Sequence, residues 1–422
     1  MKDFNYYAPT QVAFGRKAEQ ATGRLVKQYG GTKVLVHYGG KSAERSGLLD
    51  AVCRALEAEH LPYVKLGGVV PNPRLSKVHE GIDLCRAEGV DFILAIGGGS
   101  VIDSAKAISM GVTYEGDVWD FFTHKAEVDT CLPLGAVLTL PAAGSEMSDA
   151  TVITNEDGDL KKDYGSDKLR CKFAVMNPER TFTLPPYQTA AGVVDIIMHT
   201  LERYFSHDDD MTVTDSIAES LIRTVQDSAF KVLQQPDNYL HRAQIMWASS
   251  LSHNGLTGCG TTSDWATHFL EHELSGMFDV THGAGLAAVW GSWARYVYLE
   301  NPTRFAQFAV NAMGVRNNFK SAEETALAGI EALERFFRAI GMPTSIHELI
   351  GREITDEEIR EMSRKCSYDG THSIGGFKVF EPRGHGAHLP CGTLNLRVSI
   401  RGTLMETRHK KKGKSDTPFP FS

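Results

Sequence analysis

The chain has 422 residues, of which 42% are hydrophobic and 23% charged, with 40 glycines and 16 prolines. These fractions exclude collagen-like, low-complexity and fully disordered proteins, and the length suits two or three domains, each with its own core. The formal net charge of −8 argues against a general nucleic-acid-binding protein.

Targeting signals and membrane spans are not expected. The first ten residues contain no apolar signal segment, and no uncharged apolar run reaches the roughly 20 residues that a membrane span needs. The seven cysteines are scattered and form no C-x-x-C pair. We therefore expect a cytoplasmic protein with reduced thiols that does not work at a membrane.

Strands and helices alternate in the first half of the chain. Helical patterns cover residues 49–59 and 74–88. Four apolar segments are typical of buried strands: 33–38, 90–96, 134–140 and 173–176. Alternation at this spacing predicts a parallel sheet with crossover helices.

The pattern changes at Thr183-Leu-Pro-Pro-Tyr187, where two prolines mark a boundary. From about residue 188 to residue 365 long helical patterns follow, at 216–234, 243–253, 304–313 and 322–340. We expect an α/β domain over residues 1–185, an all-helical domain over 186–380, and an atypical tail over 381–422.

The tail differs in charge from the rest of the chain. It holds eight basic and three acidic residues, so it carries +5 and residues 1–380 carry −13. A basic extension that binds a partner, an aberrant end and an unrecognised helix are the three explanations. The lost periodicity favours the aberrant end.

A glycine-rich loop follows the predicted strand at residues 90–96. Gly97, Gly98, Gly99 and Ser100 lie between a strand and a helix, where backbone N–H groups and the helix N-terminus favour an anion. A plain glycine turn is the alternative. A second loop, Thr139 to Ser148, follows the next strand, so that a dinucleotide could lie across the sheet.

The turn Gly39-Gly40-Lys41-Ser42 bears on the choice of dinucleotide. It contains no acidic residue, whereas an acid there would accept hydrogen bonds from a ribose and repel a 2′-phosphate. The turn therefore favours NADP over NAD, with a polar surface turn as the alternative.

Metal-ligand side chains recur in the helical region. Asp195 and His199 are four residues apart within an apolar stretch and share one helix face. His268 and His272 share another face, and His282 follows. Buried groups of this kind need partners, and one carboxylate with three imidazoles suits Zn²⁺ or Fe²⁺.

A different class of protein is also compatible with these residues. His268-x-x-Glu271-His272 matches the H-x-x-E-H pattern of zinc metallopeptidases, with Glu271 as general base. That hypothesis leaves Gly97–Ser100 and the Asp195/His199 pair unexplained. A nucleotide-binding module without catalysis would not explain the metal ligands.

Taken together, the motifs resemble those of the iron-containing (group III) alcohol dehydrogenases, in the branch of NADPH-dependent butanol dehydrogenases and aldehyde reductases. The similar stretches cover about residues 1–380 and include residues 97–106, 139–146, 183–195, 199–205, 264–268 and 272–282. The resemblance implies a dehydroquinate synthase-like fold, with an N-terminal dinucleotide-binding α/β domain, an all-α metal-binding domain and an active site between them.

The resemblance also implies roles for individual residues. Its metal ligands fall on Asp195, His199, His268 and His282, and its catalytic residues on His272, a proton relay, and Asp103. Its cofactor contacts fall on Gly39, Gly40, Ser42, Gly97, Gly98, Gly99, Ser100, Asp103, Thr139, Ser145, Lys161 and Thr183.

The implied reaction transfers hydride between NADP(H) and a primary alcohol or aldehyde such as butanol or butyraldehyde, at one Fe²⁺ or Zn²⁺. The resemblance also implies a homodimer, which is common in the family. Glycerol dehydrogenase and dehydroquinate-synthase-like lyase chemistry stay open on the same fold. Four aromatic residues could line an apolar pocket or simply pack in the core: Trp119, Phe121, Phe122 and Trp265.

Overall fold

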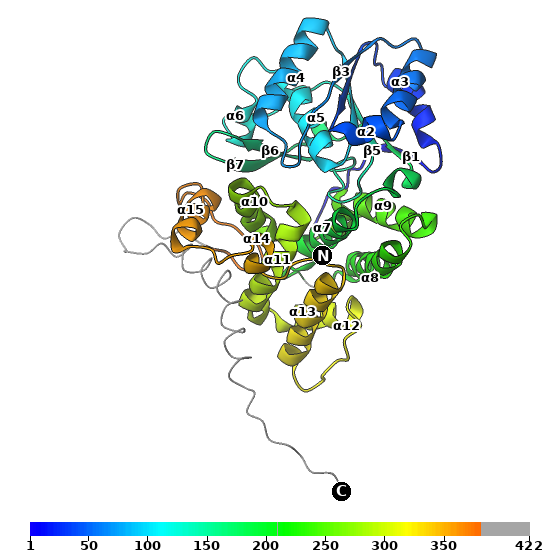
Figure 1. Cartoon of the computed structure of the whole chain (residues 1–422). Helices are drawn as coiled ribbons and strands as arrows, with labels where there is room; N and C mark the ends of the chain where they lie inside the picture. The colour runs from blue at the N-terminus through cyan, green and yellow to red at the C-terminus, as the bar shows by residue number, and fades with distance from the viewer. Residues whose placement is uncertain (209, 381–422) are drawn as a thin grey trace.

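The computed structural model describes residues 1–208 and 210–380, with a parallel sheet in the N-terminal half and a bundle of helices in the C-terminal half (Figure 1). The tail over residues 381–422 lies outside the described residues, and so do the explanations offered for it. Among the described residues, no helix combines the length and apolar character that crossing a membrane would require.

The sheet has six strands, and each neighbouring pair is parallel. In spatial order the strands are β1 (Gln11–Phe14), β8 (Phe173–Met176), β5 (Leu134–Leu138), β4 (Phe92–Gly97), β2 (Val34–Tyr38) and β3 (Tyr63–Leu66). The four predicted strands are the four central ones, and the predicted parallel sheet is confirmed. The two edge strands β1 and β3 were not predicted. Each has only four residues, most of them exposed or half-buried, so neither has the long apolar run of a buried strand.

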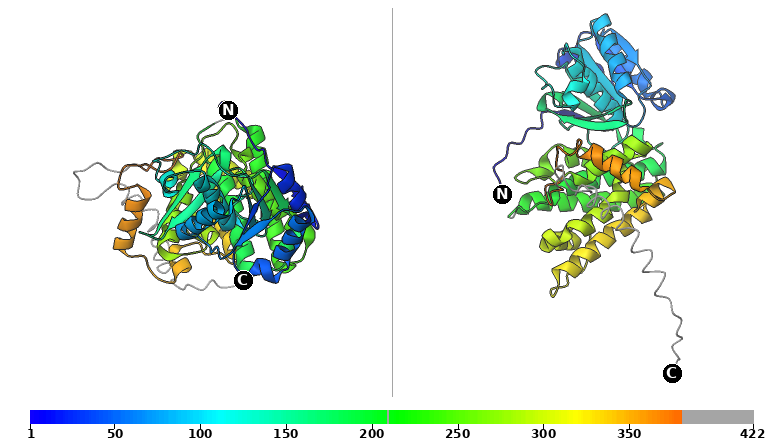
Figure 2. Two further views of the ribbon diagram at one scale, coloured as in Figure 1. Left: turned by 90° about the horizontal axis from the view of Figure 1, so that it is seen from above. Right: turned by 90° about the vertical axis from the view of Figure 1, so that its left-hand side faces the viewer.

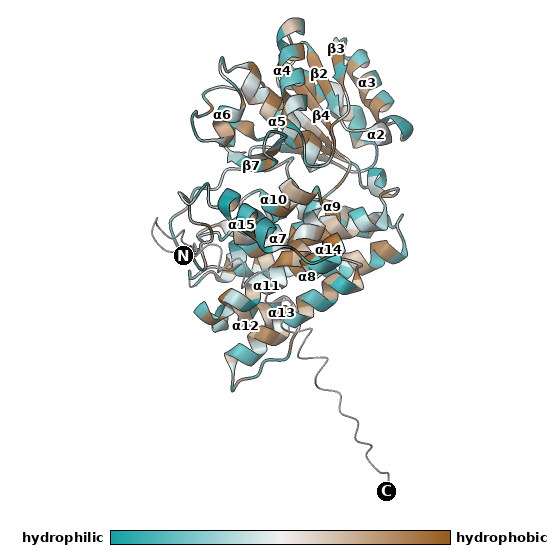
Figure 3. Ribbon diagram, turned by 60° about the vertical axis from the view of Figure 1, so that its left-hand side comes forward, coloured by the Kyte–Doolittle hydropathy of each residue, from teal (hydrophilic) through white to brown (hydrophobic). Residues whose placement is uncertain are grey.

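Helices cover both faces of the sheet (Figure 2). Along β4, Phe92, Leu94 and Ile96 belong to a core shared with α1 and α3, whereas Ile93 and Ala95 belong to a core shared with α4 and α5. The helices of this half are α1 (Thr22–Gln28), α2 (Lys41–Arg45), α3 (Leu48–Ala58), α4 (Leu75–Glu88), α5 (Gly99–Val112) and α6 (Trp119–Phe122). In Figure 3 the strands of the six-stranded sheet are drawn largely in brown, the colour of hydrophobic residues.

A two-stranded antiparallel hairpin, which the sequence pattern did not predict, extends from this half. It consists of β6 (Ala150–Asn155) and β7 (Leu160–Gly165), which pair along their full length. β7 holds Lys161, Lys162 and Asp163 in succession, so it lacks the apolar alternation of a strand. The hairpin packs against α5 on one side and reaches α10 on the other.

The C-terminal half is a bundle whose central helix is α7 (Pro186–Tyr204). From Thr189 to Tyr204 every residue of α7 is buried, because neighbouring helices surround it. The other helices are α8 (Thr212–Gln234), α9 (Tyr239–His253), α10 (Ala266–Phe278), α11 (His282–Val297), α12 (Pro302–Asn311), α13 (Ala322–Ala339), α14 (Ile346–Ile350) and α15 (Asp356–Cys366). Short 3-10 helices are η1 (Ala18–Ala21), η2 (Asp167–Leu169), η3 (Pro178–Thr181), η4 (Leu256–Gly258) and η5 (Tyr298–Glu300).

The predicted combination of an α/β half and a helical half is confirmed. All four helices predicted for the C-terminal half are present, as α8, α9, α12 and α13. Pro185 and Pro186 stand at the start of α7, as expected of a proline at the first helical position. The numerical domain boundaries at 185 and 380 stay a prediction.

Glycines let α11 approach its neighbours very closely. A Cβ atom at Gly283 would lie 2.0 Å from the carbonyl oxygen of Ala191 in α7. A separation that short is impossible for real atoms, so any side chain at Gly283 forces the two helices apart. The crossing of α7 and α11 therefore depends on glycine at this position.

We expect Gly283→Ala to destabilise the protein by about 1–3 kcal/mol through this steric overlap, although alanine favours a helix by about 1 kcal/mol over glycine. The measurement is the free energy of unfolding from urea denaturation. The control is Gly165→Ala, because nothing lies within 4 Å of a Cβ at Gly165; its effect should stay within about 0.5 kcal/mol. Equal effects of the two substitutions would contradict the close crossing.

Candidate active site

The order of the strands defines one edge of the site. The chain moves from β2 outward to β3, then returns to the other side of β2 as β4 and continues to β5 and β8. The order in which the chain adds strands therefore reverses between β2 and β4. In open α/β sheets, ligands bind beyond the carboxyl ends of the strands at such a reversal. Gly39 and Gly40 follow β2 there, and Gly97 to Ser100 join β4 to α5.

The loop after β4 is packed tightly against the loop after β5. A Cβ at Gly98 would lie 3.1 Å from Cβ of Leu140, and one at Gly99 would lie 3.1 Å from Cβ of Ala143. Only Gly98 separates β4 from α5, so the N-terminus of this fourteen-residue helix opens directly at the sheet edge. A helix N-terminus next to bare backbone is suited to a phosphate group.

Asp103 and Ser145 lie in contact in this half. Ser145 Oγ donates to the Asp103 carboxylate, and the backbone N–H of Val152 donates to Asp103 Oδ2 at 3.2 Å. Burial raises the pKa of Asp103 to about 6, against the opposing effects of Lys106, Ser145 and Val152. Asp103 thus ties α5 to the loop after β5 and to β6.

The other predicted cofactor residues are distributed along the same edge. The backbone N–H of Thr139 donates to the carbonyl of Gly97 at 3.0 Å, which joins the two loops. Ser42 is exposed in α2, and Thr183 is exposed between η3 and α7. Lys161 differs from these, because the structure places it among the predicted metal ligands.

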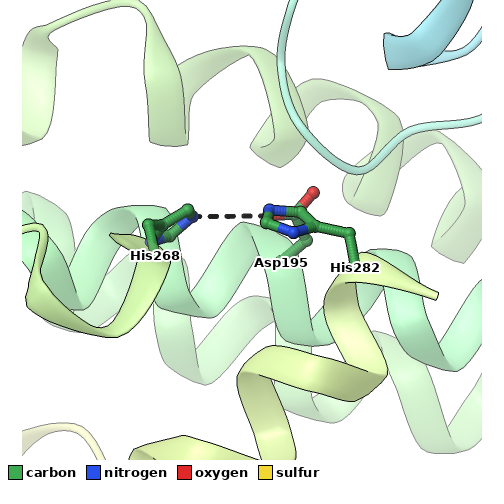
Figure 4. Close-up of side chains that lie close together, drawn as sticks. All are labelled: Asp195, His268 and His282. Carbon is green, nitrogen blue, oxygen red and sulfur yellow. Dashed lines mark ion pairs between the residues drawn. The ribbon is translucent and has the colours of Figure 1, made fainter. Parts of the chain in front are cut away.

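Three helices bring the predicted metal ligands together (Figure 4). Asp195 comes from α7, His268 from α10, and His282 is the first residue of α11. Nε2 of His268 lies 3.8 Å and Nε2 of His282 lies 3.7 Å from Oδ1 of Asp195. The ligand atoms of these three residues all lie within 4.8 Å of one another. His199 is not in this group, but its Nδ1 lies 3.2 Å from the same Asp195 oxygen.

Three buried polar atoms of Asp195, His268 and the neighbouring His199 have no hydrogen-bond partner among the described residues. They are Asp195 Oδ1, His199 Nδ1 and His268 Nε2. A buried polar atom without a partner costs about 1–3 kcal/mol, so three of them converging on one point need an explanation. A divalent cation would satisfy all three, and the oxygen and nitrogen donors suit Zn²⁺ or Fe²⁺. The residues present therefore fit the metal that the sequence implies.

The electrostatic environment differs between the histidines. Burial, together with His253, His268 and Arg203, lowers the pKa of His199 well below its ordinary value, so the ring is neutral as a ligand requires. At His268 burial acts in the same direction, but Asp195 and Glu202 outweigh it and raise the pKa to about 9. Binding of a cation at this site would therefore release a proton from His268.

A carboxylate lies behind each of two histidines. Glu202 Oε1 is 2.7 Å from Nδ1 of His268 and also accepts the backbone N–H of that residue at 3.1 Å. Glu271 is hydrogen-bonded to Nδ1 of His282. A carboxylate oxygen accepts a hydrogen bond here, so each Nδ1 carries a proton and each Nε2 is the nitrogen that faces Asp195, where a cation would replace any proton on it.

A second group of potential ligands shares His282 with the first. It contains Glu271, His272 and His282. Nζ of Lys161 lies 3.2 Å from Glu271 Oε2, and only 5% of its side chain is exposed. The buried ammonium group repels a cation there, so the first group is the better metal site.

The metallopeptidase hypothesis requires His268 and His272 to bind one ion beside a free glutamate. The described residues do not provide this arrangement, because the two histidines belong to different groups. Glu271 is also engaged, since it contacts Lys161, His282 and Ser275.

Three residues near the predicted ligands were given no role from the sequence, namely Glu202, Arg203 and His253, and Trp265 was considered only as one of four aromatic residues that could line a pocket. Glu202 could have been recognised, because it continues the helix face of Asp195 and His199 at the spacing i, i+4, i+7. The His253 ring is centred 4.0 Å from that of His199, and the Trp265 ring is centred 5.2 Å from that of His268. No spacing in the sequence predicts these two contacts, which depend on tertiary packing.

Of the four aromatic residues proposed for a pocket, only Trp265 lies beside the histidines. Its ring is held by the Arg203 guanidinium, 4.7 Å from the ring centre, and its backbone has φ = +66°. Phe121 and Phe122 are instead fully buried against Tyr164, and Trp119 stacks on Phe122. For these three, core packing is the correct interpretation.

Comparison with known proteins shows the family of this chain. Residues 9–178 match the family described as iron-containing alcohol dehydrogenase, and residues 189–374 match its C-terminal region. The chain belongs to the iron-containing alcohol dehydrogenase family, and it is an oxidoreductase of the alcohol dehydrogenase and aldehyde reductase type.

Relatives match over most of their length. The NADH-dependent butanol dehydrogenase A of Clostridium acetobutylicum is 40% identical over 380 residues, covering 90% of this chain and 96% of the relative. The NADPH-dependent aldehyde reductase YqhD of Escherichia coli is 35% identical over 351 residues, covering 82% and 89%. The crystal structure of NADH-dependent butanol dehydrogenase A from Thermotoga maritima superposes with a TM-score of 0.88 at 36% identity, covering 95% of this chain and 98% of that one.

Proposed function

We propose that the protein interconverts a primary alcohol and its aldehyde, of the size of butanol and butyraldehyde, with NADP(H) and one Fe²⁺ or Zn²⁺. The observation that carries this proposal is the set of unpartnered buried ligand atoms at Asp195, His199 and His268, in a chain of this family. The names of relatives that are 35–40% identical support the substrate class.

When bound, the metal polarises the substrate oxygen and the nicotinamide carries the hydride. The chain's own residues bind and orient these groups. Asp195, His199, His268 and His282 would hold the cation. The glycine loop from Gly97 to Ser100 would hold the cofactor phosphates at the N-terminus of α5.

We assign the proton transfer to His272. It is buried next to Glu271 and His282, in the second ligand group. Burial and the ammonium group of Lys161 lower the pKa of His272 well below its ordinary value. A neutral imidazole has one N–H that donates and one nitrogen that accepts. It can therefore take up a proton on one nitrogen and release one from the other.

The preference for NADP(H) rests on the turn after β2, where residues 39–42 include no carboxylate. The relatives differ in this respect, since their names include both NADH-dependent and NADPH-dependent enzymes. The homodimer and the cytoplasmic location stay predictions, as does the contribution of Asp103, Ser145 and Thr183 to cofactor binding.

The main test combines metal analysis with turnover of a short aldehyde series. We expect about one equivalent of divalent metal per chain, and His268→Ala should lose both the metal and the activity because it removes a ligand. His79→Ala is the control, since His79 is exposed and pairs with Asp117 far from the ligands in the fold. Full metal content and wild-type turnover in His268→Ala would refute the ligand assignment.

A separate substitution tests the proton relay. His272→Ala should retain the metal and lower kcat by about 10²–10⁴-fold, the usual contribution of general acid–base catalysis. Metal content and steady-state kinetics measured on the same preparation separate this role from metal binding. An unchanged kcat would remove His272 from the mechanism.

Gly39→Asp tests the cofactor preference. The nearest atoms to a Cβ at Gly39 are Val69 O at 3.4 Å and Val101 Cγ2 at 3.5 Å, so a side chain can be accommodated. The new carboxylate should repel a 2′-phosphate and accept ribose hydroxyls, which shifts the ratio of kcat/KM towards NADH. Gly39→Asn is the uncharged control of equal size. If both variants leave the ratio at the wild-type value, the turn does not select the cofactor.

A further inference from the structure

We infer that Glu271 is a positioning residue: it fixes the ring of His282 through Nδ1, so that Nε2 of His282 is presented to the metal. This inference rests on the proposed function, because it assumes that His282 is a metal ligand. It gives a role to the H-x-x-E-H motif that differs from the role of a peptidase base.

The contacts of Glu271 support this role. Its side chain is completely buried, and Oε2 is hydrogen-bonded to Nδ1 of His282 while Ser275 Oγ donates to Oε1. With Nδ1 occupied, the ring cannot rotate about its axis without breaking the bond. Nε2 then faces Oδ1 of Asp195 at 3.7 Å.

Lys161 holds Glu271 from a second direction. Its Nζ lies 3.2 Å from Oε2 and comes from β7, in the other half of the molecule. Only 5% of the Lys161 side chain is exposed, and the Glu271 side chain is fully buried. The carboxylate that contacts His282 is therefore fixed in place by residues of α10 and of the hairpin together.

The backbone of α11 leaves space for this carboxylate. A Cβ at Gly285 would lie 2.7 Å from Glu271 Oε1, so any larger residue would displace the side chain. Gly285 is three residues after His282, on the adjacent turn of the same helix. The helix that carries the ligand is therefore shaped to bring Glu271 and His282 together.

A matching pair on the other side of the site strengthens the argument. Glu202 contacts Nδ1 of His268 at 2.7 Å and is also buried, and Nε2 of that ring again faces Asp195. The two carboxylate–histidine pairs come from different pairs of helices, yet in both the Nε2 atom of the histidine faces Asp195 Oδ1. The partners of Glu202 lie within the helical half, whereas Glu271 also has a partner in the hairpin.

The test measures metal affinity without turnover. Chelator-stripped protein is titrated with Zn²⁺ and Co²⁺ against a chromophoric chelator, and the visible spectrum of the Co²⁺ form reports ligand geometry. Loss of an outer carboxylate on a ligand histidine typically weakens metal binding by about 10–100-fold, so we expect this loss and an altered Co²⁺ spectrum in Glu271→Gln.

The control is Glu273→Gln, the same substitution two residues along α10. Burial raises the pKa of Glu273 to about 8, so glutamine resembles its neutral form, and the residue is outside both ligand groups. Metal affinity and Co²⁺ spectrum should match wild type in this variant. If Glu271→Gln behaves like Glu273→Gln, the inference is overturned.

A double-mutant comparison decides whether Glu271 acts through His282. In a His282→Ala background, Glu271→Gln should cause no further loss of affinity, whereas in a His268→Ala background its full effect should persist. Equal losses in both backgrounds would refute the positioning role. Should Glu271→Gln fail to fold, Glu271→Asp, which retains the charge opposite Lys161, is measured instead and should give an intermediate loss. Failure of the wild-type protein to bind either metal would refute the proposed function itself.

Discussion

The convergence of unpartnered ligand atoms on Asp195 is the constraint on which the site depends. A buried carboxylate oxygen and two buried imidazole nitrogens without partners are unfavourable in a folded protein. Their cost is offset only if something with positive charge joins them. Stability and metal binding are therefore linked in this chain, as they are wherever a ligand binds the folded state alone.

The carboxylates behind the ligands make this arrangement specific. Glu202 and Glu271 each determine which nitrogen of a histidine carries the proton, and this leaves the other nitrogen free. Without them each ring could present either nitrogen. Glycines at positions 283 and 285 of α11 then allow the helices to approach closely enough for these contacts. The predicted metal site thus depends on two features besides the predicted ligands themselves: glycines in α11 and the carboxylates that contact the histidine rings.

Much of this architecture could be predicted from the sequence because it follows local rules. The central strands are continuous apolar runs, and Asp195 and His199 interrupt an apolar helix at a spacing that puts both on one face. The hairpin β6–β7 could not be predicted, because its charged residues Lys161 and Lys162 contact distant segments of the helical half, Lys161 at Glu271 and Lys162 at the ring of Tyr368. The contacts of His253 and Trp265 with the ligands were missed for the same reason, since they are set by the packing of helices.

The grouping of the histidines shows where motif reasoning fails. His268 and His272 share a helix face, which made them look like a pair, yet each turns towards a different carboxylate. Spacing along one helix determines which face of the helix a side chain lies on. It does not determine which neighbouring helix supplies the partner of that side chain. That choice is made by the tertiary structure.

Lys161 and Glu271 are separated by 110 residues along the chain. During synthesis, domains form as units from the N-terminus onward. The sheet and its hairpin are synthesised before α10 and α11, so the ion pair between Lys161 and Glu271 can form only after α10 has been made. This ion pair therefore joins the hairpin to a helix that the chain supplies later, and α12 to α15 follow that helix in turn.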